Sequence, residues 1–315
     1  MLGSIKDPYI KLKEHINKED HTIINRLQNI CKKTDNIELK LELEYKLALA
    51  KETKQINSVN EFMYFIGDEL IGYIGIGSFG GMSAAAEVNG MVHPDYRRQG
   101  IFSTLYKLVV SELKRRNSSD MLLLSDRKSI SGQSFIKNTS AEYDHTEYEM
   151  YLDYELVASN KISTEIDLRK ATNSDFDEIN RQNNIYFSEE THEDSNDDSI
   201  DLDFAVSPEE EEKRGVIAYL AISDNRVIGK VHLQIYKGVG GIFGLGVLPE
   251  YRSKGYGRTI LLLGIKILKD QGAEKIMLQV ESKNSNALNL YKSCGFYETS
   301  VMDYYRFVMG KINRI

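Results

Sequence analysis

The chain has 315 residues, 41% hydrophobic and 28% charged, which is enough apolar material for two cores of about 150 residues each. Its 40 basic and 47 acidic residues give a net charge of -7, which argues against a general nucleic-acid binder because such proteins usually carry a basic excess. Two cysteines, Cys31 and Cys294, can form no disulfide framework and lack metal-ligand spacing, which favours a reducing compartment.

The first twenty residues lack the apolar core of a signal peptide. The longest apolar stretch, residues 259–268, is interrupted by Lys266 and is too short to cross a bilayer. We therefore expect a cytoplasmic protein that uses no metal and binds neither membranes nor nucleic acid.

In the first half, residues 7–50 look charged and largely helical, with no opening strand. Strands are predicted at 61–67, 70–77 and 85–92, then a helix at 101–116, a strand at 121–125 and a long strand at 142–154. Residues 155–163 are expected to be a linker. Residues 75–80 match the dinucleotide-binding spacing Gly-x-Gly-x-x-Gly, but a strand rather than a helix follows, so we interpret them as a hairpin connection.

In the second half, capping and turn residues mark the element boundaries more clearly. A strand at 164–172 precedes a helix at 173–183, and a hairpin of 215–223 with 226–236 turns at Asp224 and Asn225. A glycine-rich strand at 240–249, in which a bulge is expected, leads to an amphipathic helix at 255–271. A strand at 275–280, a short helix at 286–294 and a last strand at 304–309 complete a mixed α/β order.

Between these elements, residues 189–212 contain twelve acidic and no basic residues. A solvated loop explains this composition, and an acceptor site for a cationic molecule is the alternative interpretation.

The two halves repeat each other. Residues 93–106 (HPDYRRQGIFSTLY) align with residues 248–261 (LPEYRSKGYGRTIL) at an offset of 155, and the same offset pairs Lys137 with Lys292. Gly72 and Gly229 match slightly upstream, at an offset of 157. Several matches in the same order indicate a duplicated domain.

The repeated unit is a strand, then Pro-x-Tyr-Arg-x-x-Gly, then a long helix. Gly255 and Gly257 let the backbone turn tightly and approach a ligand, and the first helical turn presents unpaired N–H groups. Arg252, Lys254 and Arg258 add positive charge. Glycines and basic residues at a helix N-terminus are typical of a pyrophosphate-binding site.

Residues 247–261 (VLPEYRSKGYGRTIL) resemble the acetyl-CoA-binding motif of the GNAT superfamily of N-acetyltransferases, Arg/Gln-x-x-Gly-x-Gly/Ala. Residues 278–298 resemble its second signature, at Asn284, Ala287, Leu290, Tyr291, Gly295 and Phe296. The resemblance covers residues 163–309 well and 59–154 more loosely. It implies two tandem GNAT-like domains, 1–156 with a helical extension and 163–315, each a mixed, mostly antiparallel sheet flanked by helices.

The resemblance also implies roles for single residues. Backbone amides of Leu245, Gly246 and Val247 would bind the acetyl carbonyl and the pantetheine arm. Asn284 would contact the pantetheine or the short helix, and Tyr291 would lie beside the thioester sulfur and protonate the leaving thiolate. The pyrophosphate would be held by the loop Arg252, Ser253, Lys254, Gly255, Tyr256, Gly257 and Arg258.

Three routes are open for removing the proton of the acceptor amine. Glu281 is one candidate, a water chain to the loop acids is another, and an amine that arrives deprotonated needs neither. Cys294 is interpreted as a packing residue.

The first copy departs from the pattern. At the offset of 155, Ile136 replaces Tyr291, Ser129 replaces Asn284 and Phe102 replaces Gly257, so we expect this domain to be catalytically degenerate. A phosphate cradle depends mostly on backbone, so Val92, Arg97, Arg98, Gln99 and Gly100 could still form a second cofactor site. The sequence leaves open whether this domain binds CoA.

The leading hypothesis is an acetyl-CoA-dependent N-acetyltransferase, active in its C-terminal domain by direct transfer to an amine. A cationic small amine or a protein amine is the expected acceptor. The alternative, from another class, is a non-catalytic CoA-binding sensor or scaffold.

Overall fold

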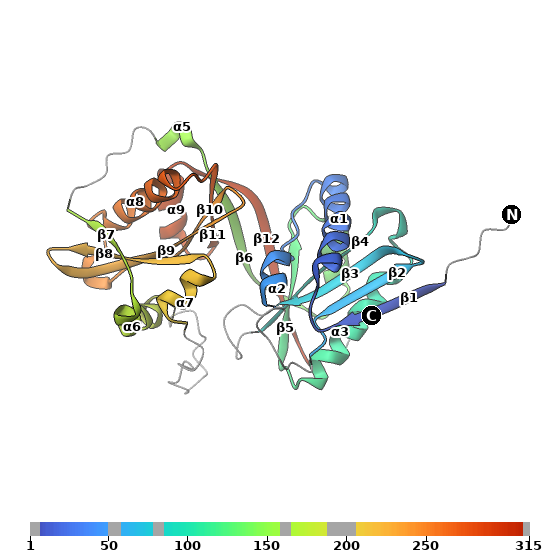
Figure 1. The fold of residues 1–315 in the computed structure, drawn as a ribbon. Coiled ribbons are helices and arrows are strands. Elements are labelled where there is room, and N and C mark those ends of the chain that lie inside the picture. Colours follow the sequence, from blue (N-terminus) through green and yellow to red (C-terminus); the bar gives the residue numbers. More distant parts are fainter. Residues whose placement is uncertain (1–6, 50–57, 78–84, 158–164, 188–205, 311–315) are drawn as a thin grey trace. The chain divides into compact units, whose positions relative to one another are not determined.

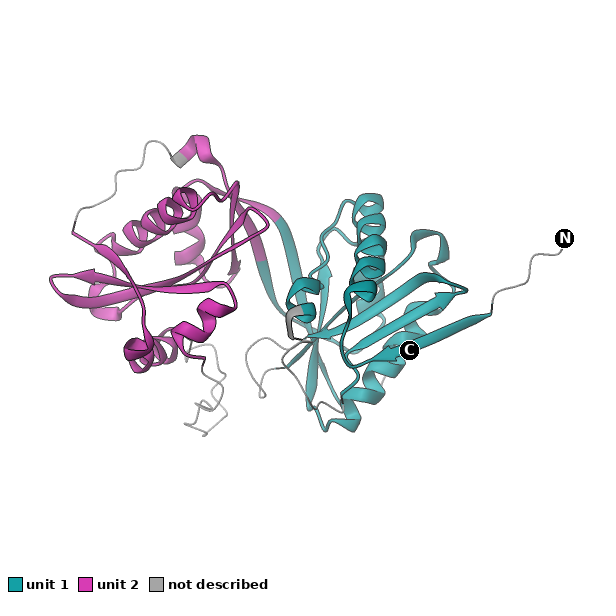
Figure 2. Ribbon diagram, in the orientation of Figure 1, with its two compact units in different colours: residues 1–147, 300–315 teal, residues 148–299 magenta. Residues whose placement is uncertain are grey.

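The computed structural model describes residues 7–49, 58–77, 85–157, 165–187 and 206–310. Two compact units divide the chain (Figures 1 and 2). Unit 1 comprises residues 1–147 and 300–315, and unit 2 comprises residues 148–299. The end of the chain therefore belongs with its beginning, whereas the domains expected from the sequence followed chain order.

Unit 1 contains a sheet in the order β1-β2-β3-β4-β5-β12. Its strands are β1 (Pro8–Lys13), β2 (Glu61–Ile66), β3 (Glu69–Gly77), β4 (Ala86–Val92), β5 (Asp120–Asp126) and the second part of β12 (Phe296–Val308). The β4–β5 pair is parallel, whereas the pairs β1–β2, β2–β3, β3–β4 and β5–β12 are antiparallel.

Strand β1 corrects one expectation, because the first copy does open with a strand. It pairs with β2, and the ring of Tyr9 stacks on Phe65 with centroids 5.1 Å apart. Most of β1 is exposed, so it lacks the alternation of buried and polar residues by which a strand is recognised in a sequence.

Helices cover both faces of the sheet in unit 1 (Figure 1). On one face, α1 (Lys18–Asp35) buries Ile24 and Leu27 against Met63 of β2, with α2 (Leu43–Leu49) nearby. On the other face, α3 (Ile101–Arg115) buries Leu105 and Val109. The short helix α4 (Ile130–Lys137) follows β5, and β6 (Glu142–Leu152) then leads into unit 2, followed by α5 (Tyr154–Val157).

Unit 2 repeats this plan with the sheet order β6-β11-β10-β9-β8-β7. Its strands are β7 (Asp167–Lys170), β8 (Val216–Ser223), β9 (Arg226–Tyr236), β10 (Val239–Val247) and β11 (Lys275–Glu281), beside the end of β6. The β10–β11 pair is parallel, as β4–β5 is in unit 1.

The helices of unit 2 also lie on two faces (Figure 1). The long helix α8 (Tyr256–Asp270) and α9 (Ser285–Ser293) pack into the main core, where Ile260, Leu261 and Cys294 are fully buried. On the opposite face, α6 (Phe176–Phe187) places Ile179 against Leu220 of β8, and α7 (Pro208–Lys213) follows.

The observed elements confirm the predicted mixed α/β fold with two repeats, and Cys294 is buried in the core, as expected of a packing residue. In the described ranges, no helix combines the length and apolar character needed to span a membrane.

Candidate functional site

Strands β10 and β11 separate where the acetyl group was predicted to bind. Their pairing ends at Ile242 and Leu278, so Leu245, Gly246 and Val247 lie beyond the last pair. The register between β10 and β9 also shifts between Phe243 and Gly246, which confirms the expected bulge. A bulge turns the strand and re-aims its backbone groups, which helps to open a gap between two parallel neighbours.

The loop after β10 has the geometry of an anion cradle. Gly255 adopts φ +82° as the N-cap of α8, and an added Cβ there would meet nothing within 4 Å. Ser253 is also left-handed, with φ +63°. The loop backbone therefore bends sharply just before α8, and Gly255 gives the helix no side-chain cap, so its first amides can bind a ligand anion.

The basic residues of this loop have distinct partners. Arg252 donates from Nε to the carbonyl of Val247 at 3.0 Å, which holds the loop against the end of β10. The Lys254 ammonium lies 5.5 Å from the Tyr251 ring centroid. Arg258 bonds to Ser293, with Nη1 and Nη2 donating to the carbonyl and hydroxyl oxygens at 3.2 and 2.6 Å, so it links α8 to α9.

The second signature forms the short helix α9. Asn284 is its N-cap and accepts a hydrogen bond from the Ala287 amide at 3.0 Å. Tyr291 is 8% exposed, its ring lies edge-on to Phe296, and burial raises its pKa to about 12. The phenol therefore stays protonated at neutral pH and keeps a proton to donate.

Glu281 lies at the end of β11 and is partly buried. Its carboxylate is 3.8 Å from the Lys283 ammonium, so the sequence-predicted base has a weak charge partner beside the gap between the strands.

The structure brings a further group of residues to the bulge of β10, which the sequence did not indicate. Lys230 of β9 is fully buried, and its ammonium donates to the carbonyl of Gly244 at 3.3 Å and lies 5.7 Å from the Tyr186 ring centroid. Burial lowers the pKa of Lys230 to about 8, although the charge of Glu211 opposes that shift. Burial, with the Lys230 charge, also lowers the pKa of His232 to about 3.

Tyr186 of α6 explains one glycine of β10. A Cβ added at Gly246 would lie 2.1 to 2.6 Å from three carbons of the Tyr186 ring, so only glycine allows the ring to approach the strand. Tyr186 is held from behind, where its hydroxyl donates to the Gln182 side chain at 2.8 Å.

Most of the acid-rich segment, residues 189–212, lies outside the described residues, which leave out 188–205. Its last four glutamates are described, in α7. Three of them bind surface partners: Glu209 accepts from Asn173, Glu210 from Lys213 and Glu212 from Lys170. The fourth, Glu211, turns inward, where its carboxylate is 3.5 Å from the His232 ring and burial raises its pKa.

Unit 1 repeats the cradle. Gly100 has φ +80° and open space around it, Arg98 has φ +64°, and Arg97 donates from Nε to the carbonyl of Val92 at 3.1 Å. The rest of the Arg97 guanidinium forms a bidentate pair with Asp35 of α1, at 2.9 and 2.7 Å. Arg97 thus fixes the loop, while Arg98 and Gln99 are exposed beside Gly100.

A cavity of about 920 Å³ opens from this loop into unit 1. It is lined by the predicted residues Val92, Arg97, Arg98 and Gly100, and by β4, β5 and α4. That volume is within the range of small-molecule sites. Phe102, which stands where the second copy has Gly257, packs beside this cavity. Its ring lies edge-on to Phe135, with ring centroids 4.6 Å apart.

The short-helix caps are equivalent in the two units. Ser129 accepts from the Gly132 amide at 3.1 Å, as Asn284 does from Ala287, so the cap survives the change of residue. Ile136, opposite Tyr291, is 4% exposed and offers no proton. Among the residues described here, no group of three or more histidine, cysteine or acidic side chains is arranged to hold a metal ion.

Comparison with known proteins agrees with this geometry. A model of the acetyltransferase (GNAT) family matches residues 27–131 and 176–296. The chain belongs to the GNAT family. Each match covers one of the two strand–loop–helix units described above.

A mycothiol acetyltransferase of Thermomonospora curvata is 39% identical over 90 residues, which are 27% of this chain and 29% of that protein. The structure of a GCN5-related N-acetyltransferase from Sphaerobacter thermophilus matches with a TM-score of 0.75 at 16% identity. The match covers 96% of this chain and 96% of that chain. A tandem GNAT protein from the clavulanic acid biosynthesis pathway has a TM-score of 0.70 at 13% identity, with 97% of this chain and 100% of that chain covered. At these identities the two structures show a shared fold.

Proposed function

We propose that the protein is an acetyl-CoA-dependent N-acetyltransferase that transfers an acetyl group directly to a primary amine in unit 2. The observation that carries the proposal is the cradle at Gly255, which follows directly on the separated strands β10 and β11. The GNAT family uses acetyl-CoA as co-substrate, and the 90-residue match to a mycothiol acetyltransferase supports the same chemistry.

In this proposal the residues of unit 2 have separate tasks. The loop from Arg252 to Arg258 binds the pyrophosphate, and the amides of Leu245, Gly246 and Val247 bind the thioester carbonyl and the pantetheine. Amide donors stabilise the oxyanion that forms when the amine nitrogen attacks that carbonyl. Tyr291 then donates its phenol proton to the departing thiolate, and Asn284 fixes the start of α9.

The amine must lose a proton before or during attack. Glu281 is the candidate acceptor at the end of β11. The inward turn of Glu211 supports the other route, a water chain to an acid of the loop, because this carboxylate is half-buried near Lys230 and His232.

A cationic amine is the proposed acceptor. Glu211 is the residue with which to test this proposal, because its carboxylate turns inward, toward the His232 ring. Glu211→Gln should raise the acceptor KM, whereas Glu210→Gln should leave it unchanged because Glu210 is an exposed side chain paired with Lys213. Equal KM values for the two variants and the wild type would refute a role for Glu211 in acceptor binding.

We also propose that unit 1 binds acetyl-CoA at Val92, Arg97, Arg98, Gln99 and Gly100, supported by the open cavity there. Calorimetric titration of the full chain should give two sites. Gly255→Glu and Gly100→Glu form a matched pair, because both glycines have φ near +80° and free surroundings. Each variant should lose one site through backbone strain and through a carboxylate placed against the phosphates.

The titration also separates the alternatives. Two sites without release of CoA in the presence of any amine would favour a CoA-binding sensor over an enzyme. No binding at all would refute the cofactor assignment in both units.

A further inference from the structure

The large cavity of unit 1 and a second, small cavity share lining residues at the point where β4 and β5 separate. The pairing of these strands ends at Val88 and Leu123, so Asn89 and Leu124 are the first residues past the last pair. Both residues line the large cavity and also a small one of about 10 Å³ on the α2 side. That volume holds one water-sized group, such as the nitrogen of an amine.

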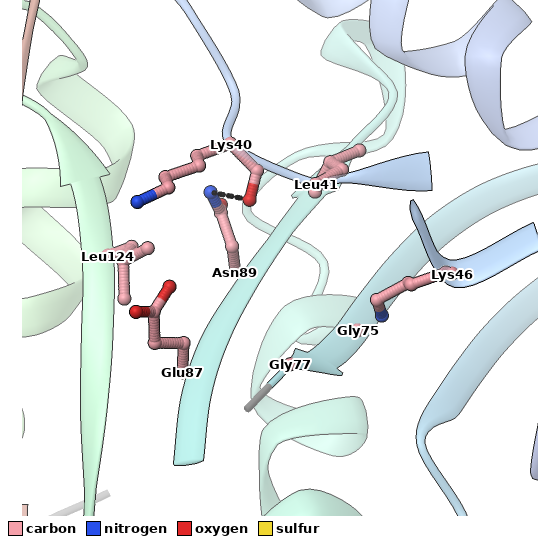
Figure 3. Close-up of a pocket in the computed structure, with 8 residues that line it drawn as sticks. All are labelled: Lys40, Leu41, Lys46, Gly75, Gly77, Glu87, Asn89 and Leu124. Atoms are coloured by element: carbon pink, nitrogen blue, oxygen red, sulfur yellow. Dashed lines mark hydrogen bonds between the residues drawn. The ribbon is translucent and has the colours of Figure 1, made fainter. Parts of the chain in front are cut away.

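A glutamate of β4 lines the small cavity. Glu87 has one carboxylate oxygen, Oε2, that is buried without a hydrogen-bond partner among the described residues. Burial raises the pKa of Glu87, with the charge of Lys40 opposing and that of Glu147 reinforcing the shift. Figure 3 shows the Glu87 carboxylate and the Lys40 side chain reaching toward the same space beside Leu124.

The cations near this space are engaged by other groups. The Lys40 ammonium donates to Glu147 at 2.8 Å and to the Tyr304 hydroxyl at 2.6 Å. Lys46 donates to both oxygens of Glu61, at 3.0 and 3.1 Å. Four carboxylates, those of Glu42, Glu61, Glu87 and Glu147, therefore share the surroundings of two lysines, with His145 as a further neighbour, and burial raises the pKa of Glu42 as well.

An ammonium group from a ligand would supply what this site lacks. It brings a positive charge and N–H donors for the unpaired oxygen of Glu87, in a space of its own size. The large cavity meanwhile reaches the same gap from the Gly100 cradle, where the pyrophosphate of the acyl donor is proposed to bind.

We propose that unit 1 contains a second acyl-transfer site, which takes a primary amine beside Glu87 and an acyl thioester in the large cavity. This inference rests on the cofactor site proposed above for unit 1. Glu87 accepts one proton from the ammonium, and the neutral nitrogen attacks the thioester carbonyl to form the C–N bond. As the C–S bond breaks, the second nitrogen proton passes to the sulfur, since Ile136 has no proton to give.

The test uses the full chain and measures release of free CoA thiol from acetyl-CoA with spermidine, glucosamine and an Nα-blocked lysine peptide. Gly255→Glu, which disables the unit 2 cradle, should keep amine-dependent release. Adding Glu87→Gln should then lower kcat by about 100-fold or more, the usual effect of losing a general base. Glu69→Gln, an exposed carboxylate on β3 of the same unit, is the matched control and should change nothing.

Calorimetry with acetyl-CoA provides the check on folding, because Glu87→Gln should still bind acetyl-CoA in unit 1. If Gly255→Glu abolishes all the release seen with the wild type, or if Glu87→Gln leaves the residual release intact, the second site is refuted while transfer in unit 2 stands. If Gly255→Glu has no effect and Glu87→Gln removes all release, transfer in unit 2 fails instead. No release by the wild type with any of the three amines would overturn both.

Discussion

Burial gives opposite acid–base properties to two residues of unit 2. The phenol of Tyr291 loses solvent, which raises its pKa to about 12, so it remains a neutral proton donor at every pH at which the protein would be assayed. The ammonium of Lys230 loses solvent as well, which lowers its pKa to about 8 and makes its charge costly at neutral pH. Desolvation disfavours the charged form of each group. The tyrosine therefore keeps its proton more tightly, and the lysine loses its proton more easily.

Tyr291→Phe should lower kcat by about tenfold or more while acetyl-CoA binding stays nearly unchanged. Phenylalanine keeps the ring packed against Phe296 and removes only the proton donor. Steady-state kinetics and calorimetry measure the two effects, and Tyr154→Phe, whose hydroxyl bonds to the Ala273 carbonyl, is the control. An unchanged kcat would leave Tyr291 with a packing role alone.

Lys230→Met should change how stability depends on pH. Between pH 8 and 10.5 the unfolded wild-type chain holds a proton that folded Lys230 has lost, so the wild-type free energy of unfolding rises with pH through this window. Methionine removes that dependence. The stability of Lys230→Met relative to the wild type should therefore be greater at pH 7 than at pH 10, by about 2 to 3 kcal/mol.

Denaturant unfolding at the two pH values measures this difference, and Lys213→Met serves as the control because Lys213 is exposed. A difference between Lys230→Met and wild type that is the same at both pH values would show that Lys230 is not titrating in this range.

At the scale of elements, β10 needs glycine where a neighbouring ring or strand comes close to its backbone. Gly246 faces the Tyr186 ring of α6, and a Cβ added to Gly229 of β9 would lie 2.3 Å from the Gly246 carbonyl. Gly257, at the start of α8, has only ordinary contacts, with Leu290 and Val247 3.5 and 3.7 Å from an added Cβ. Glycine is thus required sterically in the strands and not in the helix.

Gly246→Ala should destabilise the protein by about 1 to 3 kcal/mol, because the Tyr186 ring must move out of its place. Gly257→Ala should leave stability unchanged or raise it by up to about 1 kcal/mol, since alanine favours a helix and finds room. Thermal unfolding of the two variants tests the contrast. Equal destabilisation by both alanines would contradict this account of β10.

The sequence predicted elements well where a local pattern carries them. Residues 101–116 and 255–271 were expected as helices and are α3 and α8 to within one residue at either end. The bulge in β10 followed from its glycines. Strand β1 was missed because its side chains are mostly exposed, and its order comes from pairing with β2.

The candidate site divides in the same way. The loop at Gly255 could be read from one short motif. Lys230, Tyr186 and Glu211 could not, because they come from β9, α6 and α7 and meet only through the tertiary fold. No spacing in the chain encodes that meeting.

At the scale of the whole molecule, duplication has not produced two units that are each continuous in sequence. Residues 302–308 of β12 pair with β5 and complete the sheet of unit 1. Tyr304 and Phe307 are each 1% exposed there. Asp303 accepts hydrogen bonds from Arg127 and from Thr146 within the same unit. The sheet of unit 1 therefore depends on residues that follow unit 2 in the sequence.

Removal of residues 300–315 should accordingly disrupt unit 1 and spare unit 2. Without β12, strand β5 becomes an unpaired edge, and the buried partners of Tyr304 and Phe307 become exposed to water. Calorimetry should then show loss of the unit 1 acetyl-CoA site, with the unit 2 site retained and still sensitive to Gly255→Glu. A chain ending at residue 310, which keeps all of β12, should bind like the full chain. The chain that ends at residue 299 could instead still show a unit 1 site that is sensitive to Gly100→Glu. In that case β12 is dispensable, and residues 1–147 fold without the strand that lies beside β5.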